Sequence, residues 1–289
     1  MPKSTTVILI LLLVPGASLS ARDARPLVAA IRANYEQLSP FRATIARQIE
    51  VNGKGIVSRQ SIHSLGDSNS FRCSLQDGKL NFEFYRRDDV WYRYTPDTKS
   101  YVICGIGDMP SLLPLDPREA GAPNLQSPLA TFLLQPGVSV ESNTQGTIAT
   151  LEGPSKDEAD VWKLRFNHAE SALPLNSDVY FDHTRYLHVE ISYQNANNGA
   201  SFPSEIKYTF FGSDDGKWTQ RVIDSVTLVA YGSSVSSHDI KPPEIPSDAT
   251  VSMIPVDRGR TSWISIMAIS GIAVSCVATL IFFFARHRR

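Results

Sequence analysis

The chain is apolar at its two ends and polar between them, and this distribution constrains its fold more than any other feature. Near the start, an apolar run over residues 7–14 follows Lys3 and precedes small residues that end at Ala21. A charged residue, a short apolar run and a small-residue stretch are typical of a cleavable secretory signal peptide, and the run is too short to cross a bilayer. We therefore predict a signal peptide over residues 1–21.

The other apolar end has the length of a transmembrane helix. Residues 263–285 contain no charged side chain, and a basic cluster follows at residues 286–289. At a rise of 1.5 Å per residue the helix covers about 34 Å, enough to cross the hydrocarbon core. The positive-inside rule places the basic tail in the cytoplasm. The sequence thus predicts a single-pass cell-membrane protein whose N-terminal part lies outside the cytoplasm, facing the periplasm if the source is bacterial.

Between these ends we expect one ectodomain, over residues 22–245, and a Pro-containing stalk over residues 246–262. The formal net charge is −1, without a basic stripe, so nucleic acid is excluded as a partner. The ectodomain opens with a helix over residues 24–38. Its apolar residues recur at helical spacing, and Ser39-Pro40 ends it.

Strands dominate after this helix. Residues 41–51 alternate between apolar and polar side chains, and Asn52-Gly53 supplies a hairpin turn. Further strands are predicted at residues 56–65, 70–75, 80–84, 90–94, 101–104, 147–151, 161–166, 178–181, 186–193, 205–211 and 220–231. The pattern predicts a mainly β domain, an antiparallel meander with one apolar and aromatic face.

The alternation breaks over residues 105–137, where six prolines separate short apolar clusters. Residues 129–134 can form a short helix, while the remainder has no strand period. We interpret this segment as a cover over the apolar face of the sheet.

The sequence carries no motif of a metal centre, cofactor site or nucleophilic enzyme. The six histidines are dispersed, and neither a His-Glu-x-x-His, a Cys-x-x-Cys nor a Gly-x-Ser-x-Gly motif is present. We therefore expect no cofactor, no metal and no enzymatic activity. An enzyme would require the fold to bring a cluster of His, Asp and Glu side chains together.

Three polar positions stand out. Arg47 lies on the apolar face of its strand, where a guanidinium requires a carboxylate, carbonyl groups or a ligand head group, unless the strand end is open to water. Cys73 and Cys104 could form a disulfide in an oxidising compartment, although two predicted strands separate them.

Four stretches together resemble a known family. They are the helix followed by Phe41-x-Ala43-x-Ile45-x-Arg47-x-Ile49, the short strand from Phe71 to Leu75, the hairpin from Arg87 to Asp97, and the closing segment from His238 to Val251. Their order is similar to that of the periplasmic lipoprotein-carrier family, which includes LolA and the N-terminal domain of RseB.

The resemblance implies a strongly curved antiparallel sheet, an incomplete barrel whose hydrophobic hollow is covered by a helical or irregular lid and accepts acyl chains. With the C-terminal transmembrane helix, this is the fold class that we predict. Burial of an alkyl chain there is worth about 0.8 kcal/mol per CH2 group. The hollow and its lid are expected to use Phe41, Ile45, Arg47, Phe82, Phe84, Tyr92, Leu133 and Leu134. Alternatively, the same residues form a closed core.

Two departures from the family matter. The carrier has an arginine after its second strand that holds the lid shut, but residues 65–69 contain none. A membrane tether also prevents shuttling between membranes. We therefore expect a membrane-anchored module that holds a lipid, a lipoprotein acyl chain or another hydrophobic ligand. The alternative is a structural or sensory ectodomain with a filled core that docks another envelope protein.

Overall fold

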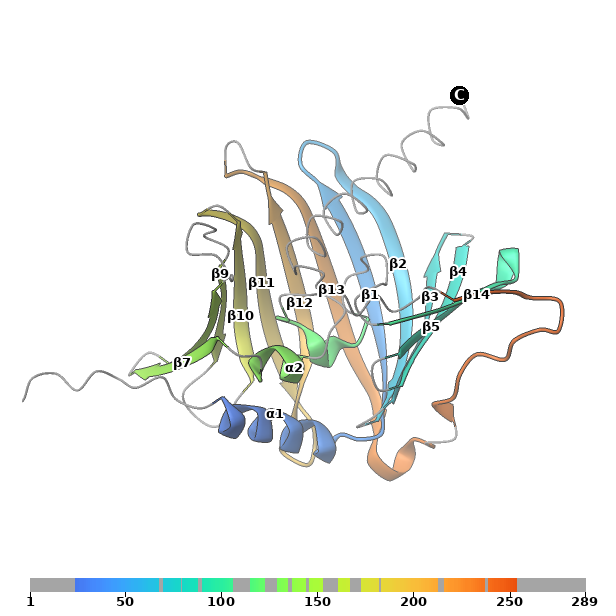
Figure 1. Ribbon diagram of the computed structural model, residues 1–289, viewed down its shortest axis with the longest axis horizontal. Coiled ribbons are helices and arrows are strands. Elements are labelled where there is room, and N and C mark those ends of the chain that lie inside the picture. The colour runs from blue at the N-terminus through green and yellow to red at the C-terminus, as the bar shows by residue number, and fades with distance from the viewer. Residues whose placement is uncertain are drawn as a thin grey trace, which may run out of the picture.

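The computed structural model consists of one helix-covered sheet (Figure 1). It describes residues 24–67, 70–78, 80–87, 90–105, 115–122, 129–134, 137–143, 146–152, 161–166, 173–181, 183–212, 216–236 and 239–253. The helices are α1 (Arg25–Gln37) and α2 (Leu129–Leu133), with short 3-10 turns at Pro96–Thr98, Pro117–Glu119 and Gly232–Ser234. The strands are β1 (Phe41–Val51), β2 (Gly55–Gly66), β3 (Ser70–Asp77), β4 (Leu80–Arg87), β5 (Val90–Thr95), β6 (Ser100–Gly105), β7 (Val138–Asn143), β8 (Gly146–Glu152), β9 (Val161–Phe166), β10 (Pro174–Phe181), β11 (Thr184–Asn195), β12 (Ser201–Phe211), β13 (Trp218–Tyr231) and β14 (Thr250–Met253).

All fourteen of these strands belong to a single sheet, in the order β14-β6-β5-β4-β3-β2-β1-β13-β12-β11-β10-β9-β8-β7. Strand β1 lies in the middle of the order and pairs antiparallel with both β2 and β13. On one side of β1 the sheet continues with β2 to β6 and ends at β14. On the other side it continues with β13 and ends at β7. The sheet is open and strongly curved, as predicted, and α1 and α2 lie on the same face of it (Figure 1). We call this helix-covered face the inner face.

Alternation along the strands explains why one face is covered. On β1, the side chains of Phe41, Ala43 and Ile45 are at most 1% exposed. Arg42 and Ala46, at alternate positions of the strand, are exposed. Successive strand residues point to opposite faces, so the apolar set of β1 lies on the inner face. Helix α1 contributes Val28 and Ile31 to the same core cluster.

The segment predicted to cover the sheet does contribute to the inner face. Its described parts are residues 115–122 and 129–134, which together we call the lid. Leu115, Leu129 and Leu133 of the lid are at most 3% exposed and belong to the core cluster that includes α1 and the inner face. The prediction of a mainly β chain with an N-terminal helix and a large, curved antiparallel sheet is confirmed.

The described C-terminal residues are attached to the edge of the sheet. Strand β14 pairs with β6, and this is the parallel pair among otherwise antiparallel described neighbours. The Thr250 N–H donates to the Lys99 carbonyl at 2.9 Å, and Lys99 also pairs with Asp248. Residues 250–253, which the sequence places in the stalk, are thus part of the sheet.

The two apolar ends of the chain, residues 1–21 and 263–285, lie outside the described residues. Within residues 24–253 as described, no helix has the length and apolar character that a membrane crossing needs. The signal peptide and the transmembrane helix therefore stay predictions.

Candidate functional site

Most of the apolar residues predicted for the hollow do lie on the inner face. Phe41, Ile45, Phe84 and Leu133 are at most 1% exposed and belong to the core cluster. Phe82 is partly buried, packs against this cluster, and lies with its ring centroid 6.3 Å from that of Phe84. Phe41, Ile45, Phe82 and Phe84 form an apolar wall on the inner face, and α1 and Leu133 of the lid contribute to the same core cluster.

Two residues of the predicted hollow lie elsewhere. Tyr92 pairs with Tyr85, which follows Phe84 along β4, so Tyr92 lies on the outer face, in contact with the rings of Tyr85 and Tyr101. The position predicted for Tyr92 is wrong because the β4–β5 turn sets a register that places Trp91 and Arg93 on the inner face instead. Leu134 follows α2 and is 47% exposed, so it does not pack against the wall as Leu133 does.

Arg47 has a carboxylate partner. It lies opposite Asp224 of β13, and its Nε and Nη2 each donate to one carboxylate oxygen at 2.7 Å. Both residues are at most 3% exposed. Two parallel charge-assisted hydrogen bonds of this kind satisfy the guanidinium. Of the explanations left open by the sequence, the partnering carboxylate is the one observed, and Arg47 is a structural element of the wall.

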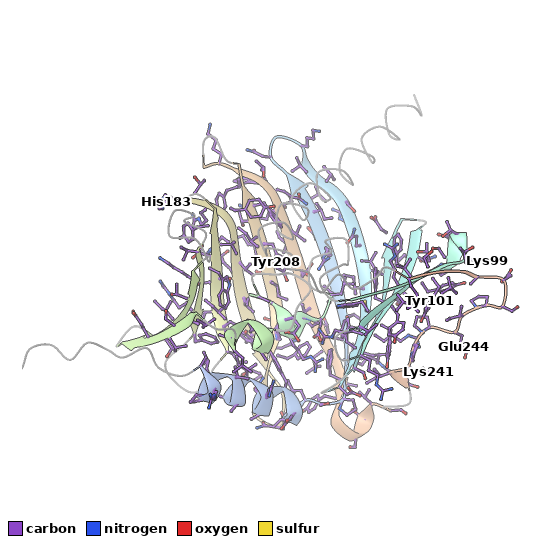
Figure 2. The ribbon with its side chains drawn as sticks, in the orientation of Figure 1. Lys99, Tyr101, His183, Tyr208, Lys241 and Glu244 are labelled. Carbon is purple, nitrogen blue, oxygen red and sulfur yellow. The ribbon has the colours of Figure 1, made fainter. Side chains whose placement is uncertain are left out.

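A buried hydroxyl lies on the same wall without a partner. Tyr208 of β12 (Figure 2) is fully buried, and its hydroxyl makes no hydrogen bond to a described residue. Burial raises the pKa of Tyr208, and the negative charge of Asp224 raises this pKa further. The hydroxyl therefore stays protonated.

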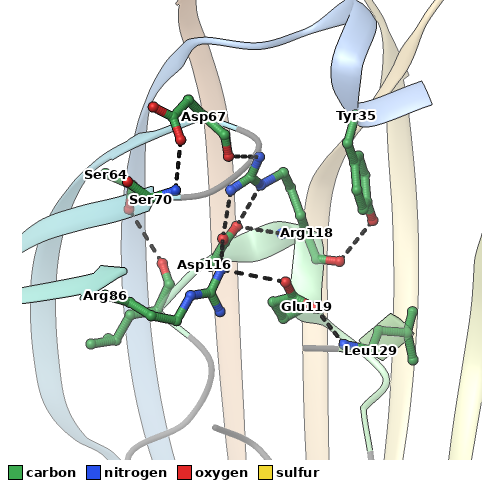
Figure 3. A network of polar contacts seen from close by, with 10 residues as sticks. Tyr35, Ser64, Asp67, Ser70, Arg86, Asp116, Arg118, Glu119 and Leu129 are labelled. Carbon is green, nitrogen blue, oxygen red and sulfur yellow. Dashed lines mark hydrogen bonds and ion pairs between the residues drawn. The ribbon is translucent and has the colours of Figure 1, made fainter. Parts of the chain in front are cut away.

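The lid is fixed to the sheet by a network of buried charges that we call the latch (Figure 3). Asp116 of the lid accepts from Arg118 Nε at 2.9 Å and Nη2 at 2.8 Å. Arg86 of β4 donates to the same carboxylate at 3.2 Å and lies 3.6 Å from a carboxylate oxygen of Glu119. The latch thus consists of Asp116, Arg118 and Glu119 on the lid and Arg86 on the sheet.

Hydrogen bonds to backbone groups surround the latch. Arg118 Nη1 donates to the Asp67 carbonyl at 2.9 Å, in the connection after β2, and the Tyr35 hydroxyl of α1 donates to the Arg118 carbonyl at 2.7 Å. The Leu129 N–H donates to Glu119 at 2.6 Å, which joins α2 to the latch. The latch therefore connects α1, β4, the β2–β3 connection and both described parts of the lid (Figure 3).

Two glycines permit this close approach. A Cβ at Gly66 would lie 2.5 Å from the ring of Phe41 and 2.9 Å from Arg118 Nη2. Gly121 of the lid has a φ of +93°, and a Cβ there would lie 3.1 Å from Leu164 of β9. Its carbonyl accepts from the indole N–H of Trp162, also on β9, at 3.2 Å. The lid is thus held at both flanks of the sheet.

The charges of the latch shift its two carboxyl groups in opposite directions. Burial alone raises the pKa of Asp116, but the adjacent Arg118 and Arg86 outweigh it and hold this pKa below its ordinary value. Burial raises the pKa of Glu119, and the negative charge of Asp116 adds to this rise, so that Arg86, the Leu129 N–H and Arg118 together do not compensate for it. Asp116 is therefore the charged centre of the latch.

The latch was not predicted from the sequence. Residues 65–69 contain no arginine, and the guanidinium that binds the Asp67 carbonyl comes from the lid, at Arg118. The signal available was the charged triplet within a Pro-rich apolar segment, where charges are costly to bury without partners.

The cysteine left open for a disulfide that can be described, Cys73, is not bonded in one. Cys73 of β3 is a buried free thiol, and burial raises its pKa well above the ordinary value. Strands β4 and β5 separate β3 from β6, the strand of Cys104. Three strand spacings of about 4.8 Å exceed the Cα separation that a disulfide spans. Among the described side chains, no group of three or more His, Cys, Asp or Glu residues is placed to hold a metal ion.

Comparisons with known proteins give matches among solved structures. No protein-family model matches the chain, and neither does any curated protein. A LolA superfamily protein of Nitrosomonas europaea matches with a TM-score of 0.49 and 10% identity, over 77% of this chain and 99% of that chain. A Vibrio parahaemolyticus domain described as an outer membrane lipoprotein-sorting protein matches with a TM-score of 0.43 and 10% identity, over 75% and 97%. A DUF1329 family protein of Desulfovibrio piger gives 0.43 and 10%, over 76% and 97%.

At 10% identity, the likeness concerns the fold alone.

Proposed function

We propose that the chain is a binding module that holds an acyl chain, of a lipid or a lipoprotein, between the inner face of its sheet and its lid. The observation that carries this proposal is the construction of the lid. Its leucines cover an apolar wall, while its backbone is fixed by a latch of charges and hydrogen bonds.

The two kinds of contact have different consequences for opening. The lid is not a strand of the sheet, so it can move without breaking the strand ladder that contains Phe84 and Phe41. When the lid moves away, these apolar side chains lose their cover, and an alkyl chain can replace it at about 0.8 kcal/mol per buried CH2 group. The strength of the latch then determines the free-energy difference between the closed state and the liganded state.

A second candidate function rests on the same wall. Phe41, Ile45, Phe84 and Leu133 are already buried with the lid in place, which is the arrangement of a filled core. A module of this kind would dock another envelope protein through its surface and bind no lipid. The two functions differ in whether the lid opens, so they are separable by experiment.

The predicted signal peptide and transmembrane helix supply the location in this proposal. The sheet lies in the cell envelope, outside the cytoplasm, and stays attached to the membrane through residues 263–285. Because β14 pairs with β6, the tether leaves the sheet at its edge, beside the flank formed by β3 to β6. A tethered module receives or presents its ligand at that membrane, in contrast to a carrier that diffuses.

Photo-crosslinking of the full chain in its membrane tests the proposal. Cells expressing the chain are fed a fatty acid that carries a diazirine and an alkyne, irradiated, and the labelled peptides are mapped by mass spectrometry. Labelling is expected in peptides that cover β3 to β6 and residues 129–134, in addition to the predicted span. Labelling confined to residues 263–285 would contradict lipid binding and support the filled-core interaction module.

A matched pair of variants links the labelling to the lid. Asp116→Asn weakens the latch and is expected to raise labelling of the inner face, because the open state becomes more populated. Asp178→Asn is the control. Asp178 of β10 is partly exposed and contacts His188 and Arg185 of β11, away from the latch. Equal labelling of both variants would show that the lid does not govern access.

A further inference from the structure

Besides Arg47 and Arg86, Arg93 lies on the inner face, and its surroundings differ from those of both. Arg93 of β5 pairs with Phe84 of β4 and with Val102 of β6, so all three side chains share the inner face. Phe84 and Val102 are at most 9% exposed, and Phe82 lies on the same face two residues before Phe84. Arg93 thus extends from an apolar and aromatic surface.

This guanidinium has no partner among the described residues. Arg93 Nε is buried and makes no hydrogen bond, and none of the carboxylates that the structure describes forms an ion pair with Arg93. An arginine keeps its charge at any physiological pH, so its donors stay unsatisfied rather than being neutralised. Since Arg93 as a whole is only partly buried, its charge remains accessible from solvent.

The neighbouring inner-face residue of β5 also carries an unpaired donor. Trp91 is 5% exposed, and its indole N–H makes no hydrogen bond. The ring of Trp91 is held in place by an edge contact with Phe71 and by Arg86 of the latch, 5.6 Å from its centroid. Residues two apart on a strand lie about 7 Å apart on the same face, so the two unpaired donors belong to one region of the inner face. An indole N–H can donate but cannot accept.

We infer that Arg93 and Trp91 form the head-group site of the proposed ligand, and that this head group is an anion with several acceptor oxygens. The inference rests on the proposed function, in which the acyl chain lies along the wall of Phe82 and Phe84. A carboxylate or a phosphate satisfies the free guanidinium and accepts from the indole N–H. The ligand is therefore an anionic amphiphile, either a fatty acid or a phosphate-bearing acyl lipid. Arg47, whose charge is matched by Asp224, takes no part in this recognition.

Three photoreactive probes with the same alkyl chain test the inference on the full chain in membranes. They are a fatty acid, the corresponding lysophosphatidate and the uncharged methyl ester, applied at about pH 8, where both anionic head groups are ionised. The labelling of peptides covering β4 and β5 is divided by that of residues 263–285, which report partitioning into the membrane. This ratio is expected to be about tenfold higher for an anionic probe than for the ester, a difference typical of one charge-assisted contact. The probe with the higher ratio, carboxylate or phosphate, identifies the source of the anion.

Variants assign the preference to the site. In Arg93→Met, the labelling ratio of the anionic probe is expected to fall to the value of the ester, while the labelling ratio of the ester is unchanged. Arg93→Lys keeps the charge and should keep most of the preference. Arg87→Met is the matched control, because Arg87 is an exposed residue of β4 adjacent to the buried Arg86 and so points to the outer face. Trp91→Phe should reduce the preference by a smaller factor.

The outcomes separate the inference from the proposed function. If the three probes label β4 and β5 equally, in the natural chain and in Arg93→Met, the head-group site is overturned while acyl-chain binding stands. If no probe labels these strands above the predicted span, the binding function itself fails. If Arg87→Met abolishes the preference as Arg93→Met does, the effect is one of general surface charge, and the site is likewise overturned.

Discussion

Arg47 and Arg93 both project from apolar strands onto the inner face, yet their charges are compensated differently. Arg47 is matched by the bidentate carboxylate of Asp224 at the centre of the sheet, with both groups buried. Arg93, on the flank formed by β3 to β6, has no carboxylate partner among the described residues, and its Nε is buried without an acceptor. The same residue type in the same kind of pattern is therefore structural in one place and available in the other.

The comparison teaches that the role of a charged residue follows from its partners in the fold. Its position among the apolar residues of a strand does not reveal that role. Removing one member of a buried ion pair leaves the other unpaired in a medium of low dielectric constant. Removing a charge that has no partner in the folded chain leaves nothing unpaired. The two arginines should therefore respond oppositely to the same substitution.

The largest effect is expected for Arg47→Met. The substitution leaves the Asp224 carboxylate buried and without its two donors, which destabilises folded chains by about 3–5 kcal/mol. Thermal and urea unfolding of the full chain measure this loss. The double variant Arg47→Met with Asp224→Leu should recover much of it, because no charge is then left unpaired. A double variant as unstable as the single one would show that the pair contributes more than mutual compensation.

Asp116→Asn should have the next largest effect, and a local one. It leaves Arg86 and Arg118 buried opposite a neutral amide, and we expect a loss of about 2–3 kcal/mol. Because Asp116 holds the lid, the loss should appear first as faster proteolysis within residues 115–122 and 129–134, before global unfolding. Asp178→Asn is the control for removing a carboxylate elsewhere.

The contribution of Asp116 also depends on pH with a defined sign. Its pKa in the folded chain lies below the ordinary value of 3.8, so its stabilisation is present above that pH and is lost as the pH falls through the lowered value. Glu119 acts in the opposite direction, since its pKa is raised by burial. The difference in stability between the natural chain and Asp116→Asn should therefore shrink on acidification below about pH 4. A difference in stability that stays constant down to low pH would show that the stabilisation does not come from the negative charge of Asp116.

The strands were predictable because each alternates clearly between a buried and an exposed face. Strand β1 begins and ends where its pattern does, at Phe41 and Val51, and β9 likewise matches its prediction. Strands β7 and β14 were not predicted. All four residues of β14 are exposed, so no apolar period marks it, and its partner β6 is distant in the sequence. Edge pairing of this kind is set by the tertiary fold alone.

The site was predictable in its apolar part and not in its polar part. Phe41, Ile45 and Phe84 follow from the alternation within each strand, but the face of β5 depends on the turn that precedes it, and Tyr92 was placed on the wrong side. The latch comes from a segment without any period, where the sequence gives charges but not their partners. The free state of Arg93 is a property of its neighbours across β4 and β6, which only the register reveals.

Arg93→Met should be neutral or stabilising, in contrast to Arg47→Met. The substitution removes a buried Nε without an acceptor and keeps an unbranched side chain against Phe84 and Val102. We expect the free energy of unfolding to rise by about 0–1 kcal/mol in the ligand-free chain. Unfolding of the natural chain and of the Arg87→Met control, after removal of lipid, provides the comparison. A loss as large as that of Arg47→Met would mean that Arg93 has a structural partner.

A similarly small effect is expected for Tyr208→Phe, which tests the centre of the sheet rather than its flank. The hydroxyl of Tyr208 is buried near the Arg47–Asp224 pair and makes no hydrogen bond, so its removal relieves an unsatisfied group and keeps the ring. A gain of about 0.5–1 kcal/mol in thermal or urea unfolding is expected. Lipid labelling should be unchanged, because the charge at this end of the wall is already compensated by Asp224. If Tyr208→Phe instead lowered labelling by the anionic probes as Arg93→Met does, the head group would extend to both arginines, and the distinction between them would fail.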